Sequence, residues 1–110
     1  MYIRKVLFVF LLCLASLSAF AEGDYQAGKI KAYTCTGCHG IVNYQNTYPT
    51  YPVPRIGGQN KEYLVIAMNA FKSGEREHKT MNLQAEALSD QDIEDIAVYI
   101  AAQTTKTNAE

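Results

Sequence analysis

One pentapeptide, Cys35-Thr36-Gly37-Cys38-His39, constrains this chain more than any other feature of its sequence. The spacing places two thiols about one helical turn apart, so both can reach the two vinyl groups on one edge of a haem and form thioethers. The histidine after the second cysteine then lies beneath the ring, where its imidazole can ligate the iron. The motif therefore predicts one haem c, covalently attached through Cys35 and Cys38, with His39 as an axial ligand.

The start of the chain has the pattern of an export signal. Two basic residues precede an apolar run over residues 6–20, and small residues at Ala19 and Ala21 form a cleavage pattern. These features are typical of a secretory signal peptide. About 15 apolar residues also fall short of the roughly 20 that a membrane-spanning helix requires. We therefore expect residues 1–21 to be removed and the protein to be periplasmic; the alternative is an uncleaved segment that stays as an anchor helix.

Cleavage there would leave residues 22–110, a chain of 89 residues. Cys13, Arg4 and Lys5 leave with the signal, so two cysteines remain and the formal net charge changes from -1 to -3. So small a chain forms one domain and depends on a cross-link, a metal or a cofactor for a stable core. A charge this close to neutral gives no nucleic-acid-binding surface, and 48% hydrophobic residues exclude a disordered chain.

Three other uses of the two cysteines are weighed against haem attachment. A thioredoxin-like redox site would be expected in a βαβ context, and the sequence has no such pattern. A structural zinc ion needs four ligands, and the candidates are Cys35, Cys38, His39 and His78, two of which are neighbours. An inert disulfide between the two cysteines is the third alternative, because an exported protein meets an oxidising compartment.

The longest periodic stretches of the mature chain follow a helical pattern. One helix is expected over residues 24–33, a second one ending at Gly74, and a last one near the C-terminus. Their expected N-caps are Asp24, Asn60 and Ser89. The faces expected to be buried are Ala27, Ile30 and Tyr33 in the first helix, Leu64, Ala67, Met68 and Phe71 in the second, and Ile93, Ile96, Ala97 and Ile100 in the last.

Residues 40–58 are rich in glycine, proline and tyrosine, which is the composition of a loop. A long ordered loop in a small domain usually wraps a bound group or forms a binding segment. We expect this one, with Tyr44, Tyr48 and Tyr51, to cover the haem.

These motifs give the chain a resemblance to a known family. The segments that carry it are Ala27-Gly28-Lys29, Cys35-x-x-Cys38-His39-Gly40, residues 54–59, residues 71–76, Met81 and residues 88–93. Together they resemble the class I cytochromes c, in particular small bacterial monohaem proteins similar to one half of the dihaem c-four subgroup. The resemblance implies an all-α cytochrome c domain over residues 22–110, with three to five helices wrapped around one covalently bound haem.

The same resemblance implies that Met81, in the loop before the last helix, is the second axial ligand of the iron. Two competitors remain. His78 stands among charged residues and is expected to be solvated, whereas Met68 falls on the apolar stripe of its helix, where methionine more often packs the core.

Further roles follow from the resemblance for residues near the haem. A ligating histidine usually donates its other N–H to a fixed acceptor, and the expected acceptor for His39 is the Pro54 carbonyl. Arg55 is the first candidate to hold the haem propionates, followed by Gln59 and Tyr63.

An iron with two protein ligands cannot readily bind a substrate, so one-electron transfer through the haem edge remains. We therefore expect an electron carrier, not an enzyme, which docks transiently with redox proteins. No small-molecule substrate and no nucleic acid is expected, and the membrane is reached only through partner complexes. The alternatives are a haem subunit of a larger dehydrogenase or oxidase complex, and a haem peroxidase or gas sensor with an open sixth site.

Overall fold

The computed structural model describes residues 2–3, 22–40 and 53–103. Between residues 22 and 103 the described part forms five helices and no strand. They are α2 (Tyr25–Lys31), α3 (Tyr33–His39), α4 (Lys61–Ser73), α5 (Lys79–Glu86) and α6 (Asp90–Ala101). The predicted all-α fold is therefore confirmed.

Parts of two predictions lie outside the described residues. These are the signal peptide, apart from residues 2–3, and the section of the loop over residues 41–52 that holds its three tyrosines. Among the described helices, none combines the length and the apolar character needed to cross a membrane.

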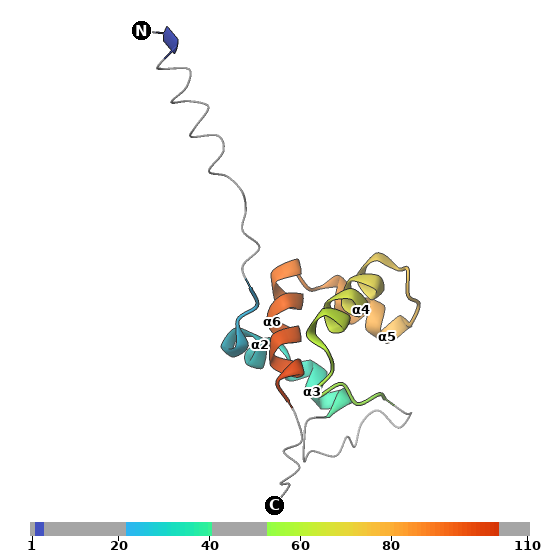
Figure 1. Cartoon of the computed structure of the whole chain (residues 1–110). Coiled ribbons are helices and arrows are strands. Elements are labelled where there is room, and N and C mark those ends of the chain that lie inside the picture. Colours follow the sequence, from blue (N-terminus) through green and yellow to red (C-terminus); the bar gives the residue numbers. More distant parts are fainter. Residues whose placement is uncertain (1, 4–21, 41–52, 104–110) are drawn as a thin grey trace, which may run out of the picture.

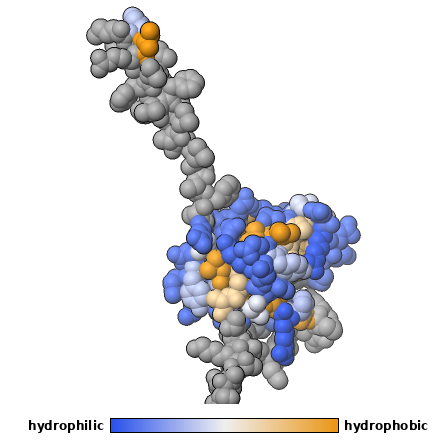
Figure 2. All heavy atoms as spheres, in the orientation of Figure 1, coloured by the Kyte–Doolittle hydropathy of each residue, from blue (hydrophilic) through white to orange (hydrophobic). Residues whose placement is uncertain are grey.

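The helix α6 lies between two neighbours, with α2 on one side and α4 on the other (Figure 1). The helix α5 packs against α4, and α3 continues the chain after α2. On the face drawn in Figure 2 the surface is mostly hydrophilic, and its hydrophobic side chains form small separate patches. The apolar core contains Ala32, which follows α2, Leu64 of α4, and four residues of α6: Ile96, Ala97, Tyr99 and Ile100.

The sequence predicts α6 correctly because its cap and its apolar stripe agree. The Ser89 side chain accepts a hydrogen bond from the Asp92 N–H at 3.1 Å, and the Asp92 carboxylate accepts one from the Ser89 N–H at 2.9 Å. This reciprocal capping box satisfies two N–H groups at the start of the helix. The predicted inner face is buried, with Ile93, Ile96, Ala97 and Ile100 all 5% exposed or less.

The helix α4 also has the predicted ends. The Asn60 side chain accepts a hydrogen bond from the Tyr63 N–H at 2.9 Å. At the other end, Gly74 has a φ of 81°, a left-handed conformation that glycine adopts without strain. On the predicted inner face Leu64 is buried, while Ala67, Met68 and Phe71 are half-buried.

The prediction for the first helix is wrong in two respects. The helix that Asp24 caps ends at Lys31, and a separate helix, α3, starts at Tyr33. Ile30 and Tyr33, expected inside, are 77% and 80% exposed. The buried residues in this region are Gly28 and Ala32, because α2 crosses α6 too closely for larger side chains.

A buried carboxylate joins α2 to α6 at this crossing. Asp95 is 3% exposed and accepts hydrogen bonds from the Asp24 N–H at 2.7 Å, Lys31 Nζ at 2.6 Å and Gln91 Nε2 at 2.8 Å. Burial by itself would raise the pKa of Asp95, but these hydrogen bonds outweigh it and lower the pKa below its ordinary value. The start and the end of α2 are therefore tied to one point on α6.

Candidate haem-binding site

A cavity of about 320 Å³ lies among the helices of the described part. Cys35, Cys38 and His39 line it from α3, and Met81 lines it from α5. Most of the remaining wall is apolar, and half of its residues come from α4 and α6: Leu64, Met68, Ile93, Ile96, Ala97 and Ile100. The fold thus brings the haem-attachment motif and the expected methionine to one cavity.

The motif reaches the cavity because it is helical. Positions i, i+3 and i+4 of a helix share one face, and Cys35, Cys38 and His39 have this spacing within α3. Both cysteines are half-buried free thiols. Burial raises the pKa of the Cys35 thiol, so that thiol stays protonated near neutral pH.

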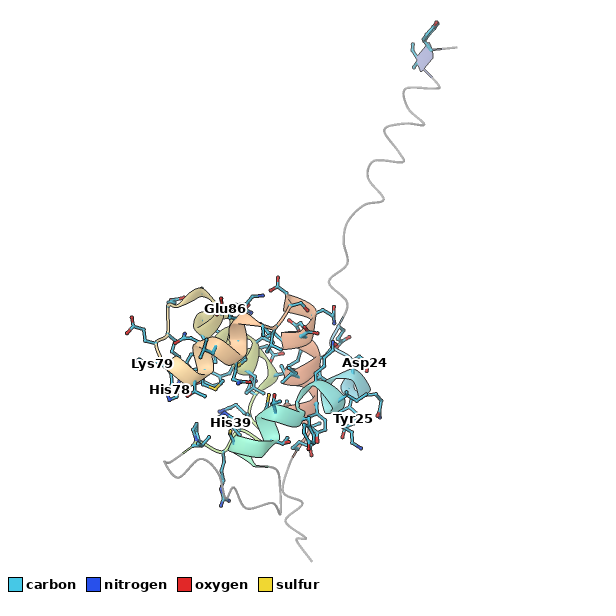
Figure 3. All side chains as sticks on the ribbon, turned by 180° about the vertical axis from the view of Figure 1, so that it is seen from behind. Asp24, Tyr25, His39, His78, Lys79 and Glu86 are labelled. Carbon is cyan, nitrogen blue, oxygen red and sulfur yellow. The ribbon has the colours of Figure 1, made fainter. Side chains whose placement is uncertain are left out.

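The His39 ring is oriented by the last part of the expected loop over residues 40–58. Its Nδ1 lies 2.7 Å from the carbonyl oxygen of Pro54. A carbonyl oxygen can only accept, so Nδ1 carries the proton and Nε2 keeps the free lone pair that a metal ligand needs. Figure 3 shows His39 at the end of α3, below α4 and α5 in that view.

Met81 lies in a helix, which corrects the expectation that it lies in the loop before the last helix. It is the third residue of α5, whose N-cap is His78. This helix has only eight residues and no acidic residue in its first turn. Packing against α4, which a sequence pattern does not reveal, accounts for its formation.

The two competitors of Met81 lie in different places. Met68 lines the same cavity from α4, so it is a second thioether within the site. His78 is exposed and lies at the start of α5 beside a separate open groove, formed by the end of α4 and by α5 (Figure 3). Its Nδ1 accepts the N–H of Met81 at 3.4 Å.

The residues suggested for the propionates do not line this cavity within the described part of the chain. Arg55 and Gln59 are exposed, in the segment between Pro54 and α4. The Gln59 side chain accepts the Asn60 N–H at 2.9 Å, and the Tyr63 hydroxyl accepts a hydrogen bond from Arg76 at 3.4 Å.

Sequence reasoning missed several polar residues at the cavity. Thr80 and Gln84 line it from α5, Lys31 lines it from the end of α2, and Thr34 lines it from the start of α3. Thr80 and Gln84 have the i, i+4 spacing of one helix face. This spacing indicates a shared face only if residues 79–86 form a helix, and the sequence pattern does not predict that helix.

The donor set fits a c-type haem. Two free thiols, an imidazole with a free Nε2 and a thioether meet at an apolar cavity, and this combination suits covalent attachment and axial ligation. It does not fit the zinc alternative. Within residues 2–3, 22–40 and 53–103, no three side chains of histidine, cysteine, aspartate or glutamate form a group that could hold a metal ion.

Comparison with known proteins points the same way. A family model described as cytochrome c matches residues 25–104, which include all five helices. The chain is 40% identical over 85 residues to cytochrome c4 of Pseudomonas aeruginosa, an alignment that covers 77% of this chain and 41% of that protein.

Two further relatives differ in length. Cytochrome c-554(548) of Halomonas halodenitrificans is 39% identical over 84 residues, covering 74% of this chain and 98% of that protein. Cytochrome c4 of Stutzerimonas stutzeri is 34% identical over 110 residues, covering 91% of this chain and 51% of that protein. The chain thus spans about half the length of the c4 relatives and nearly all of the c-554(548) relative.

Proposed function

Because the chain belongs to the cytochrome c family, we propose that it is a periplasmic one-electron carrier whose haem iron has His39 and Met81 as axial ligands. The observation that carries the proposal is the shared cavity to which α3 brings the attachment motif and α5 brings Met81. A domain of this family holds a covalently bound c-type haem, and Cys35 and Cys38 are the cysteines that can attach it.

When bound, the haem supplies an iron that gains and loses one electron. The chain's own residues fix its surroundings. Cys35 and Cys38 would hold the haem covalently, and the hydrogen bond from His39 to the Pro54 carbonyl sets the orientation and the tautomer of the imidazole. A thioether from Met81 favours the reduced iron relative to a second histidine.

The outer parts of the site are proposed from chemistry alone. Arg55 follows the residue that contacts His39 and is an exposed cation, which suits it to hold a propionate. Redox proteins would dock transiently at the haem edge, and electron transfer there needs no small-molecule substrate.

Residues 1–21 would direct export. The mass of the protein recovered from the periplasm should then correspond to a chain starting at Glu22.

Absorption spectroscopy of the purified holoprotein tests the ligands. A weak long-wavelength charge-transfer band of the oxidised protein is expected from methionine ligation. It should vanish in Met81→Ala and persist in Met68→Leu, which keeps the volume of the second thioether in the cavity, and in His78→Ala. Loss of the band in Met68→Leu with its retention in Met81→Ala would assign the ligand to α4 instead.

Carbon monoxide separates the carrier from a haem protein with an open sixth site. Added to the reduced protein at neutral pH, it should bind slowly, because Met81 must first leave the iron. Rapid binding to the wild type would contradict the proposal and favour a gas sensor or a peroxidase. Met81→Ala serves as the matched control that should bind rapidly.

A further inference from the structure

The first turn of α5, which carries Met81, is weakly capped by its own N-cap residue. The first N–H groups of a helix have no partner within that helix. Histidine is not among the preferred N-caps, and the distance of 3.4 Å between the Met81 nitrogen and His78 Nδ1 is long for a hydrogen bond. The position of Met81 therefore depends on what else holds this turn.

Asn82, the next residue, uses its whole side chain for this purpose. Its Oδ1 accepts the backbone N–H of His78 at 2.7 Å. Its Nδ2 donates to the carbonyl oxygen of Phe71 at 2.7 Å and to that of Arg76 at 2.9 Å. An amide side chain offers two N–H donors and one carbonyl oxygen, so both donors and the acceptor are engaged.

These partners connect α5 to the end of α4. Phe71 lies in the last turn of α4, where carbonyl groups lack partners within the helix. The Phe71 carbonyl accepts the Gly74 N–H at a longer 3.3 Å, and the neighbouring carbonyl of Ala70 is already bound by the Arg76 N–H. Asn82 thus joins the start of α5, the connecting turn and the end of α4 through a single side chain.

The helix α4 is itself anchored to α6 at both of its ends. Leu64, in the first turn of α4, is buried in the same apolar cluster as Ile96 and Ile100 of α6. Lys72, in the last turn of α4, pairs with Asp90 of α6 at 3.1 Å. An amide that fastens α5 to the end of α4 therefore fastens it to the core.

We propose that Asn82 is a positioning residue that keeps Met81 at the haem iron. This inference rests on the proposed function, since it needs Met81 as the axial ligand. Without the Asn82 amide, the first turn of α5 opens more readily and carries the Met81 thioether away from the iron. Asn82 does not line the haem cavity, so it acts through the backbone of α5.

Carbon monoxide binding to the reduced holoprotein measures this opening, because the ligand enters only after Met81 leaves. Asn82→Ala should bind on the order of tenfold faster than the wild type, because it removes all three side-chain hydrogen bonds that hold this turn. Asn69→Ala is the matched control. Asn69 is exposed, and its Nδ2 donates to the Val65 carbonyl of its own helix at 3.0 Å, so its rate should equal that of the wild type.

Thermal melting separates positioning from general stability. Two temperatures are compared: the one at which the charge-transfer band disappears and the one at which the helical circular dichroism is lost. In Asn82→Ala the band should disappear at the lower temperature, with a wider gap between the two temperatures than in the wild type. In Asn69→Ala this gap should equal that of the wild type. A purely structural role for Asn82 would lower both temperatures together, and that result would overturn the proposal. So would a wild-type rate of carbon monoxide binding in Asn82→Ala.

A second variant covers the case in which Asn82→Ala does not accumulate with haem. Asn82→Asp keeps the side-chain shape and the oxygen that accepts the His78 N–H, but it loses both donated bonds. It should show the same two changes, and wild-type behaviour would contradict the inference. Absence of the charge-transfer band from the wild type would instead refute Met81 ligation, so failures of the two proposals are distinguishable.

Discussion

Gly28 lies where the backbone of α2 comes closest to that of α6. A Cβ atom at this position would overlap the Asp95 carbonyl and would lie 2.9 Å from the Tyr99 Cβ. On the next turn Ala32 is fully buried. Small residues on this face therefore permit the crossing, which then allows the buried Asp95 side chain to reach both ends of α2.

Gly28→Ala is expected to destabilise the holoprotein by about 1–3 kcal/mol, because backbone and packed side chains must shift to admit the new methyl group. Urea unfolding followed by far-ultraviolet circular dichroism measures the change. Gln26→Ala, at an exposed position of the same helix, should stay within about 0.5 kcal/mol of the wild type. Equal stabilities of the two variants would contradict the close approach.

The charges at this crossing predict how stability depends on pH. A hydrogen bond from Lys31, together with those from Ser89, lowers the pKa of Asp92 to about 2, and the pKa of Asp95 is also lowered. Between about pH 4 and pH 2 the unfolded chain therefore binds protons that the folded chain does not. The free energy of unfolding should fall as the pH falls through this range.

Lys31→Gln should make this decrease shallower, because Lys31 pairs with Asp92 at 2.7 Å and with Asp95 at 2.6 Å. Urea midpoints measured at several values between about pH 5 and pH 2 give the slope. Lys29→Gln removes the same charge at an exposed position of the same helix and should keep the wild-type slope. If the two variants gave the same slope, the Lys31 pairs would not be its cause.

At the scale of helices, local signals decide which elements the sequence reveals. The helices α4 and α6 have strong N-caps and long apolar stripes, so caps and periodicity predict them. The helices α3 and α5 have seven and eight residues, and their caps are Ala32 and His78. Helices this short are marginal by themselves, so their surroundings determine that they form.

The cap of α6 can be tested alone. Ser89→Ala should lower the free energy of unfolding by about 1 kcal/mol, since the Asp92 N–H loses its side-chain acceptor. Ser89→Gly should cost only a few tenths of a kcal/mol, because glycine is itself tolerated at an N-cap. Urea unfolding of the wild type, Ser89→Ala and Ser89→Gly measures these free energies. An unchanged unfolding midpoint in Ser89→Ala would show that the Ser89–Asp92 capping box does not stabilise the protein.

For the molecule as a whole, the cavity explains how so small a chain builds a core. In the described part, α2 is the only helix whose backbone packs against α3, although α3 carries the attachment motif. The cavity separates α3 from the apolar faces of α4 and α6. Haem would fill this space and supply contacts that the side chains do not.

Preventing haem attachment should therefore affect the helices unequally. In Cys35→Ser combined with Cys38→Ser, amide hydrogen exchange should accelerate most in α3 and α5, because these helices border the cavity and are too short to be stable by themselves. The crossing of α2 and α6, held by Asp95, should keep more of its protection. Mass-spectrometric exchange against the haem-loaded wild type measures this, and uniform acceleration in all five helices would contradict it.

The sequence by itself determined the haem motif, the all-α class, the limits of α4 and the start of α6, because spacing, caps and periodicity are local properties. It did not determine that α3 and α5 exist, that Ile30 and Tyr33 are exposed, or that Asp95 is buried beneath Lys31. Those features depend on how closely α2 crosses α6 and on the packing of α5 against α4. Contacts between residues far apart in the chain set these distances, so only the tertiary structure decided them.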